Sequence, residues 1–204
     1  MDQIPESDGE EQQIKIMTLG NSSVGKTSFI LKYTENSFNE KYASTIGIDY
    51  KIKVLKIKER NYKLFLYDTT GQERFRSLAY NLIKNADGIL LMYDITNKES
   101  FQSIPEWIKN IKEKRGNNFP IILLGNKIDL EEKREVKKED GEDFAEEHKI
   151  KFFEISNKEG INIDEACLTL LLEILTNFKK NEKSCNASVL STYSFKEKKS
   201  KKCC

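Results

Sequence analysis

The sequence predicts a single α/β domain with a six-stranded, mostly parallel sheet flanked by helices. Between residues 14 and 178, short apolar runs alternate with amphipathic stretches. Several of these runs are apolar on both faces, as parallel strands covered by helices on each side must be. A glycine-containing loop joins the first apolar run to a helical pattern, which is typical of a phosphate-binding loop. We therefore expect a doubly wound sheet with its ligand at the carboxyl ends of the strands.

Each short apolar run is expected to form one strand. The expected strands are 14–19, 49–59, 63–67, 88–95, 120–125 and 151–156. The segment 49–59 interleaves apolar residues with lysines, which indicates a half-exposed edge strand. Because Asn61 follows it, we expect a hairpin with 63–67.

Helices are expected between these strands. Thr96 and Glu99 form a capping box that predicts a helix over 97–115. The charged segment 136–149 predicts another helix, and the single histidine, His148, should occupy a solvated surface position there. The last helix carries an apolar stripe at helical spacing, so its cysteine should pack in the core. The stripe comprises Ile163, Cys167, Leu170, Ile174 and Phe178.

Charge is distributed unevenly along the 204 residues, although the net charge is only +1. We expect residues 1–13 to be a disordered acidic extension, 14–178 to be the folded domain and 179–204 to be a flexible tail. A nucleic-acid-binding protein is more often basic across its folded part, so we expect no nucleic acid partner. The acidic start does not fit a signal peptide, and the spacing of the four cysteines fits neither zinc nor a disulfide framework.

The first loop, "GNSSVGKTS" (20–28), has the features needed to bind phosphates. Its backbone N–H groups can converge on a β-phosphate at the start of a helix. Lys26 would neutralise phosphate charge, and the Thr27 hydroxyl would bind Mg²⁺. The nucleotide-binding residues expected here are Ser22, Ser23, Val24, Gly25, Lys26, Thr27 and Ser28.

The second loop, "YDTTGQE" (67–73), also follows a strand. Asp68 can hold Mg²⁺ through an intervening water, and Gly71 allows its N–H to approach a γ-phosphate. Gln72 can orient an attacking water and is the expected catalytic residue. An acidic turn is the alternative, and the convergence of two such loops on one sheet edge argues against it.

The third loop, "GNKIDL" (125–130), predicts guanine selection. The Asp129 carboxylate can accept two hydrogen bonds from N1–H and the 2-amino group of guanine, and adenine offers neither donor. Asn126 would brace the loop, and the Lys127 stem would lie on the base. The fourth piece, Ser156, Asn157 and Lys158, would close over the base from the other side.

With these four loops in order, residues 14–178 resemble the Rab branch of the Ras-like small GTPases. "GNSSVGKTSF" (20–29) and "STIGIDY" (44–50) look most like Rabs of regulated secretion. The resemblance implies that Phe38 lies beside the base and that Thr45 binds Mg²⁺ and the γ-phosphate. It also implies a GTPase that cycles between GTP and GDP, slowly without a GAP, and whose switches at 38–50 and 69–82 bind effectors when GTP is bound. Vesicle traffic, including exocytosis, is the implied process, with an exchange factor, a GAP, GDI and a prenyl escort protein as partners.

The chain ends in "KEKKSKKCC". The terminal Cys203 and Cys204 resemble the family's site for two geranylgeranyl groups. Two lipid chains suffice for stable anchoring, and the lysines add attraction to anionic lipid. The resemblance implies the cytoplasmic face of a vesicle or the plasma membrane, with cycling through the cytosol.

Several positions depart from the family pattern. Thr70 stands where alanine is usual, and we expect it to slow hydrolysis or to accept the phosphoryl group itself. The alternative function is therefore a slowly hydrolysing, GTP-dependent membrane scaffold. The effector-reading aromatics become Tyr50, Tyr67 and Leu82, and Asn157 replaces another alanine. A metabolic kinase or ATPase ranks far behind, because its arginine-rich lid is missing and Asp129 disfavours adenine.

Overall fold

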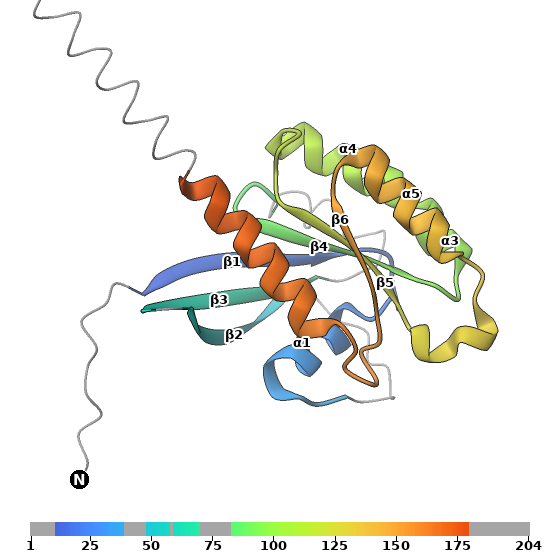
Figure 1. Ribbon diagram of the computed structural model, residues 1–204, viewed down its shortest axis with the longest axis horizontal. Coiled ribbons are helices and arrows are strands. Elements are labelled where there is room, and N and C mark those ends of the chain that lie inside the picture. The colour runs from blue at the N-terminus through green and yellow to red at the C-terminus, as the bar shows by residue number, and fades with distance from the viewer. Residues whose placement is uncertain (1–10, 39–47, 58, 70–82, 180–204) are drawn as a thin grey trace, which may run out of the picture.

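A six-stranded sheet forms the centre of the computed structural model, which describes residues 11–38, 48–57, 59–69 and 83–179 (Figure 1). The strands lie in the order β2-β3-β1-β4-β5-β6. Only β2 and β3 pair antiparallel, and the other neighbouring strands of this sheet pair parallel. The strands are β1 (Gln12–Leu19), β2 (Ile48–Ile57), β3 (Arg60–Thr69), β4 (Gly88–Asp94), β5 (Ile121–Asn126) and β6 (Lys151–Ile155). The predicted fold class and the predicted hairpin are confirmed.

Helices cover both faces of the sheet, and each face has its own apolar cluster. On one face, α1 (Lys26–Glu35) and the helix over 163–179 pack on the sheet around Phe29 and Leu170. On the other, α4 (Ile104–Arg115) and α5 (Lys138–His148) pack around Trp107 and Tyr93. The strands β4 and β5 are buried along their whole length, as predicted for strands covered on both faces. The core therefore holds the carboxyl ends of the parallel strands in fixed positions.

The element bounds differ from the sequence-based expectations at several ends. Strand β1 begins at Gln12, which pairs with Tyr62, so the expected disordered extension over 1–13 is wrong at Gln12 and Gln13. Residues 1–10 of that extension lie outside the described part of the chain. Strand β3 is longer than expected because it pairs with β2 along its whole length, from Arg60 to Thr69. The last helix reaches residue 179, one residue beyond the expected end of the domain.

The helix expected over 97–115 is two helices, α3 (Lys98–Gln102) and α4. Pro105 lies in the first turn of α4, where a missing N–H is tolerated, so a new helix begins there. The expected capping box is also wrong. Asn97 caps α3 by accepting a hydrogen bond from the backbone N–H of Ser100, while Thr96 donates to the carboxylate of Asp94.

The apolar stripe of the last helix faces the core, as expected. Cys167 is fully buried within it, and burial raises the pKa of its thiol well above the usual range. His148 differs from expectation, because it is half-buried with its ring edge-on to Phe144. Burial lowers the pKa of this imidazole.

Within the described residues, none of the helices combines the length and the apolar character that a membrane span requires.

Candidate functional site

The loops that follow β1, β5 and β6 meet at the carboxyl edge of the sheet, where β3 also ends. The phosphate loop, residues 20–27, follows β1 and enters α1. The base loop, residues 126–130, begins at the last residue of β5, and the fourth loop, residues 156–158, follows β6. Two side-chain amides connect these distant segments. The Asn126 amide donates to the Val24 carbonyl at 2.8 Å, and the Asn157 amide donates to the Gly25 carbonyl at 2.9 Å. Residues predicted to form one site are therefore brought together.

Close approach requires glycine at two positions of the phosphate loop. Gly20 has φ +140°, and a Cβ there would lie 2.2 Å from the carbonyl oxygen of Met92. Gly25 has φ +102°, and its Cβ would lie 2.3 Å from the side-chain nitrogen of Asn126. Both conformations favour glycine, and neither position has room for a side chain. The loop consequently packs directly against its neighbours, and α1 begins at the next residue, Lys26.

Lys26 provides a buried cation at the start of α1. Its ammonium group donates to the carbonyls of Gly20 at 3.1 Å and Asn21 at 2.7 Å. Burial lowers the pKa of Lys26 to about 8, and the nearby charge of Asp68 partly opposes this shift. A bound anion would stabilise the charged form, so the arrangement suits phosphate binding.

Thr27 and Asp68 place two oxygen ligands side by side. The Thr27 hydroxyl donates to an Asp68 carboxylate oxygen at 2.7 Å. The end of β3 is fixed beside β1, because the Thr69 hydroxyl donates to the Thr18 carbonyl at 2.8 Å. Among the described residues there is no cluster of three His, Cys, Asp or Glu side chains that could hold a metal ion. A hydroxyl and one carboxylate fit Mg²⁺, which keeps several waters and takes phosphate oxygens as further ligands.

The base loop turns sharply after β5 and is held by an ion pair and two hydrogen bonds. Lys127 adopts the left-handed conformation, with φ +74°, and leads into the 3₁₀ helix η2 (Ile128–Lys133). Its ammonium pairs with Asp94 at 2.6 Å. Asp129 accepts a hydrogen bond from the Ser156 hydroxyl at 2.6 Å, and the backbone N–H of Asn157 donates to the Asn126 side chain at 3.3 Å. These contacts join the third and fourth predicted loops.

The remaining predicted residues have varied positions. Ser22, Ser23 and Lys158 are exposed, and Phe38, just after α1, is 38% exposed. Other expected residues lie outside the described part of the chain, so their roles stay predictions: Thr45, Thr70, Gly71, Gln72, Leu82, Cys203 and Cys204.

Sequence reasoning missed a link between the phosphate loop and α4. The Asn21 amide donates to the Ser103 hydroxyl at 2.9 Å, and the Trp107 indole N–H donates to the Asn21 side-chain oxygen at 3.3 Å. No local pattern signals this link, because its partners lie 82 and 86 residues apart. It anchors the outer side of the loop to the helix layer.

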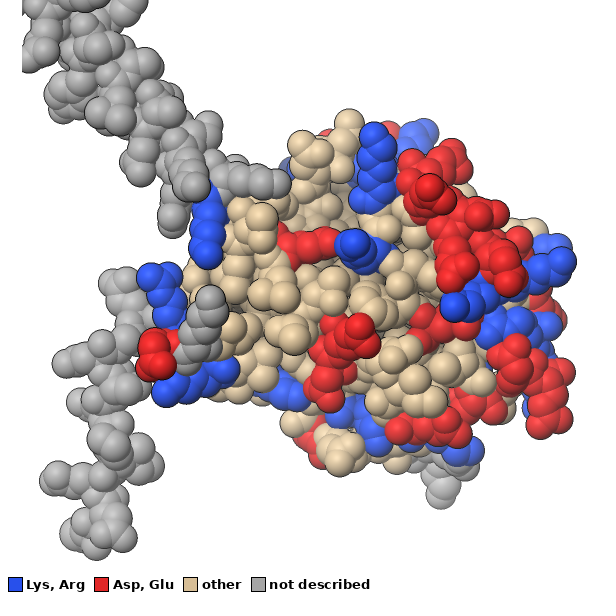
Figure 2. All heavy atoms as spheres, viewed as in Figure 1, with Lys and Arg blue, Asp and Glu red and all other residues tan. Residues whose placement is uncertain are grey.

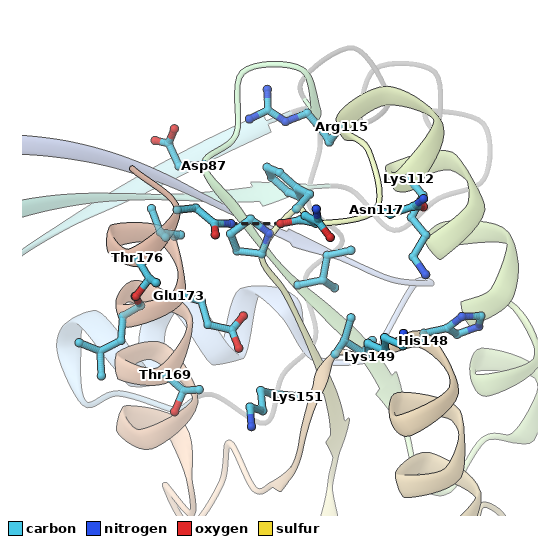
Figure 3. Close-up of a pocket in the computed structure, with 18 of the residues that line it drawn as sticks. Asp87, Lys112, Arg115, Asn117, His148, Lys149, Lys151, Thr169, Glu173 and Thr176 are labelled. Carbon is cyan, nitrogen blue, oxygen red and sulfur yellow. Dashed lines mark hydrogen bonds between the residues drawn. The ribbon is translucent and has the colours of Figure 1, made fainter. Parts of the chain in front are cut away.

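The opposite, amino-terminal edge of the sheet has a broad hollow between the last helix, α4 and α5 (Figure 3). Its labelled side chains carry both signs of charge, among them Lys112, Arg115, Lys151 and Glu173. Figure 2 likewise shows acidic and basic residues close together at the right of the molecule and a mostly uncharged centre on the face in view. Over the described residues, neither this hollow nor this face forms the continuous basic patch that is typical of nucleic acid binding.

The comparisons with known proteins agree with the arrangement of the loops. The Ras family model matches residues 15–176. The chain is 43% identical over 192 residues to Ras-related protein Rab-13 of Rattus norvegicus, covering 93% of this chain and 94% of the relative. It is also 43% identical over 177 residues to Ras-related protein Rab-8 of Diplobatis ommata, covering 86% and 84%. A third relative, Ras-related protein Rab-10 of Diplobatis ommata, is 43% identical over 161 residues, covering 79% and 80%. The chain therefore belongs to the Rab branch of the Ras family, as a small GTPase that binds GTP and GDP with Mg²⁺, hydrolyses GTP and regulates vesicle traffic through regulators and effectors.

Proposed function

We propose that the nucleotide lies along the carboxyl edge of the sheet, with its phosphates in residues 20–28 and its guanine at the base loop. Thr27 and Asp68, together with Thr45, hold Mg²⁺. Asp129 selects guanine, while Lys127, Asn157 and Lys158 line the base pocket and Phe38 lies beside it. The observation that supports this placement is the pair of amide hydrogen bonds, which joins the base loop and the fourth loop to the phosphate loop.

The chemical step proposed here is hydrolysis of the γ-phosphate bond by water. Gln72 orients that water, and the N–H of Gly71 contacts the γ-phosphate. Lys26 supplies positive charge from a buried position, where electrostatic stabilisation is strongest. Mg²⁺ adds neutralisation of phosphate charge when it is bound. Without a GAP to complete the charge stabilisation, hydrolysis is slow.

Effectors bind switch residues 38–50 and 69–82 in this proposal. The exposed ring of Tyr50 lies 5.9 Å from that of Phe65 and 5.7 Å from that of Tyr67, which gives a described part of this surface an aromatic character. An exchange factor, a GAP, GDI and a prenyl escort protein complete the cycle. Geranylgeranylated Cys203 and Cys204 hold the protein on the cytoplasmic face of a vesicle or the plasma membrane, and exocytosis is the proposed step.

Nucleotide competition tests the guanine assignment. The full chain, loaded with fluorescent mant-GDP, should release it to excess GTP but not to ATP, and ITP should compete less well because it lacks the 2-amino group. The variant Asp129→Ala should lower GDP affinity by about a hundredfold or more, since it removes two hydrogen bonds to one charged group. Asp143→Ala, at an exposed position of α5, is the matched control. Equal competition by ATP and GTP would contradict the assignment.

Thr70 favours the second candidate, a scaffold that binds GTP and hardly hydrolyses it. Single-turnover release of labelled γ-phosphate separates the two functions. Release that speeds up in Thr70→Ala would show that the threonine slows the reaction. Label that stays on the chain, and is lost in Thr70→Ala, would identify Thr70 as a phosphoryl acceptor.

A further inference from the structure

Asn157 occupies a position where its side chain bridges two loops far apart in the sequence. Its side-chain nitrogen donates to the Gly25 carbonyl at 2.9 Å, and only 3% of the residue is exposed. The neighbouring amide of Asn126 donates to the preceding carbonyl, that of Val24, at 2.8 Å. Two consecutive carbonyls of the phosphate loop are thus each held by an amide from the base side of the site.

The orientation of the Asn157 amide follows from its surroundings. Exchanging its oxygen and nitrogen would set two acceptors, the amide oxygen and the Gly25 carbonyl, against each other. In the observed orientation its oxygen is buried and has no hydrogen-bond partner among the described residues. An alanine at this position would have no side-chain oxygen to bury without a hydrogen bond. The asparagine therefore has a desolvation cost here that alanine would not have.

The bridge also acts on the direction of the loop's N–H groups. A peptide carbonyl and the N–H of the following residue belong to one planar unit and point in opposite directions. When the Gly25 carbonyl is fixed toward Asn157, the N–H of Lys26 is fixed away from it, at the N-terminus of α1, where anions bind. The Gly25 carbonyl also accepts from the N–H of Phe29 at 2.9 Å, so the same peptide is tied to the first turn of the helix.

We propose that the Asn157 side chain is a positioning residue that clamps the fourth loop, residues 156–158, to the phosphate loop and slows nucleotide release. The clamp rests on the proposed placement of the nucleotide along this edge. It is distinct from the expected role of Asn157 in closing over the base, because it uses the side chain and acts on the phosphate side of the site.

Release of mant-GDP from the full chain in excess Mg²⁺ tests the clamp. Asn157→Ala should release nucleotide about five- to thirty-fold faster, the range expected for one buried hydrogen bond. Asn157→Asp has the same shape but offers a carboxylate to the Gly25 carbonyl, so it should release at least as fast as the alanine variant. The association rate of both variants should stay within about twofold of the parent, since the clamp acts on the closed site.

A spectroscopic signal distinguishes positioning from a general loss of stability. The ³¹P resonance of the β-phosphate of bound GDP should move in Asn157→Ala, because the N–H groups around it change direction. The matched control is Asn177→Ala, in the hollow at the opposite edge of the sheet, where an amide also donates to a backbone carbonyl, that of Asn118, at 3.1 Å. This control should change neither release nor the resonance.

The results test the clamp separately from the proposed position of the nucleotide, on which the clamp depends. Release from Asn157→Ala at or below the parent rate, with an unmoved resonance, would overturn the clamp while leaving the placement intact. Release of mant-GDP from Asn157→Asp at the parent rate would also overturn it. A side chain of the same shape would then retain the nucleotide without the amide donor. Failure of the parent to bind mant-GDP at all would overturn the placement itself.

Discussion

The two edges of the sheet differ in how their loops are held. At the carboxyl edge, side chains bridge segments that lie up to 132 residues apart, and their donors and acceptors are largely buried. At the amino edge, the loops border an open hollow, and their side-chain contacts are more exposed, as in the hydrogen bond from Asn177 to Asn118. Buried polar bridges fix geometry at a cost that exposed contacts do not carry. The difference indicates that the loops are positioned most precisely at the edge where the nucleotide is proposed to bind.

A pair of glycines, one at each edge, provides the largest test of this difference. Gly25→Ala should lower the free energy of unfolding by about 4 kcal/mol and abolish nucleotide retention, because a positive φ is combined with collisions at 2.3 and 2.8 Å. Gly116→Ala, at φ +82° with nothing within 4 Å of its Cβ, should cost about 2 kcal/mol from strain alone and retain nucleotide. Urea unfolding and mant-GDP retention measure both effects. Equal losses in the two variants would show that the edges do not differ in this way.

A pair of arginines, one at each edge, should show an intermediate difference in the free energy of unfolding. Arg134, which directly follows η2, binds Glu131 at 2.7 Å and Glu154 at 2.6 Å, whereas Arg115 at the amino edge donates to the Lys84 carbonyl. Arg134→Gln should lower the free energy of unfolding at pH 7 by about 2 kcal/mol, because Glu154 is left partly buried without its partner. Arg115→Gln should cost about 0.5 kcal/mol. Urea unfolding of both variants measures the losses, and a larger loss in Arg115→Gln would reverse the comparison.

The contribution of Arg134 to the free energy of unfolding should decrease as the pH falls. Its hydrogen bond holds the pKa of Glu131 below the usual value of 4.5. A carboxylate with a lowered pKa stabilises the fold above its unfolded pKa, and this contribution is lost as the pH falls through its folded pKa. The difference between the parent and Arg134→Gln should therefore shrink below about pH 4.5, as measured by unfolding at a series of pH values. A difference that grows on acidification would contradict the ion-pair explanation.

A smaller effect than the loss of Arg134 is expected at a buried hydroxyl near the carboxyl edge. The Tyr93 hydroxyl is buried and has no hydrogen-bond partner among the described residues. Burial raises the pKa of this phenol above its usual range. Tyr93→Phe should raise the free energy of unfolding by about 1 kcal/mol, because it removes an unmatched polar group and keeps the ring. Thermal unfolding measures the gain, and a loss of stability would mean that the hydroxyl contributes to the fold.

Much of the sheet is predictable from sequence because it depends on local pattern. Runs such as 88–95 and 120–125 are apolar almost throughout, and strands of that kind belong at the centre of a parallel sheet. The loop motifs that follow the strands carry their own spacing. Lys26, Asp68 and Asn126 can therefore be assigned to one edge of the sheet from the sequence.

Contacts between distant segments are not predictable in this way. The bridges from Asn157 to Gly25 and from Trp107 to Asn21 depend on which loops the fold places together, and neither leaves a periodic signal. Both Asn97 and Thr96 are of a residue type that caps helices. Asn97 caps α3, because Thr96 donates to the carboxylate of Asp94, at the end of β4, instead. Competition between neighbouring polar residues of this kind is decided by tertiary contacts.

The link from Trp107 to Asn21 gives the protein a built-in optical label. The chain has one tryptophan, and its indole is buried with its N–H directed at the phosphate loop. Indole emission responds to the polarity and hydrogen bonding around the ring. Tryptophan fluorescence of the unmodified protein, excited selectively over the tyrosines, therefore reports on a single place, directly before the exposed Ser22 and Ser23, and can follow the loop in real time without any attached dye.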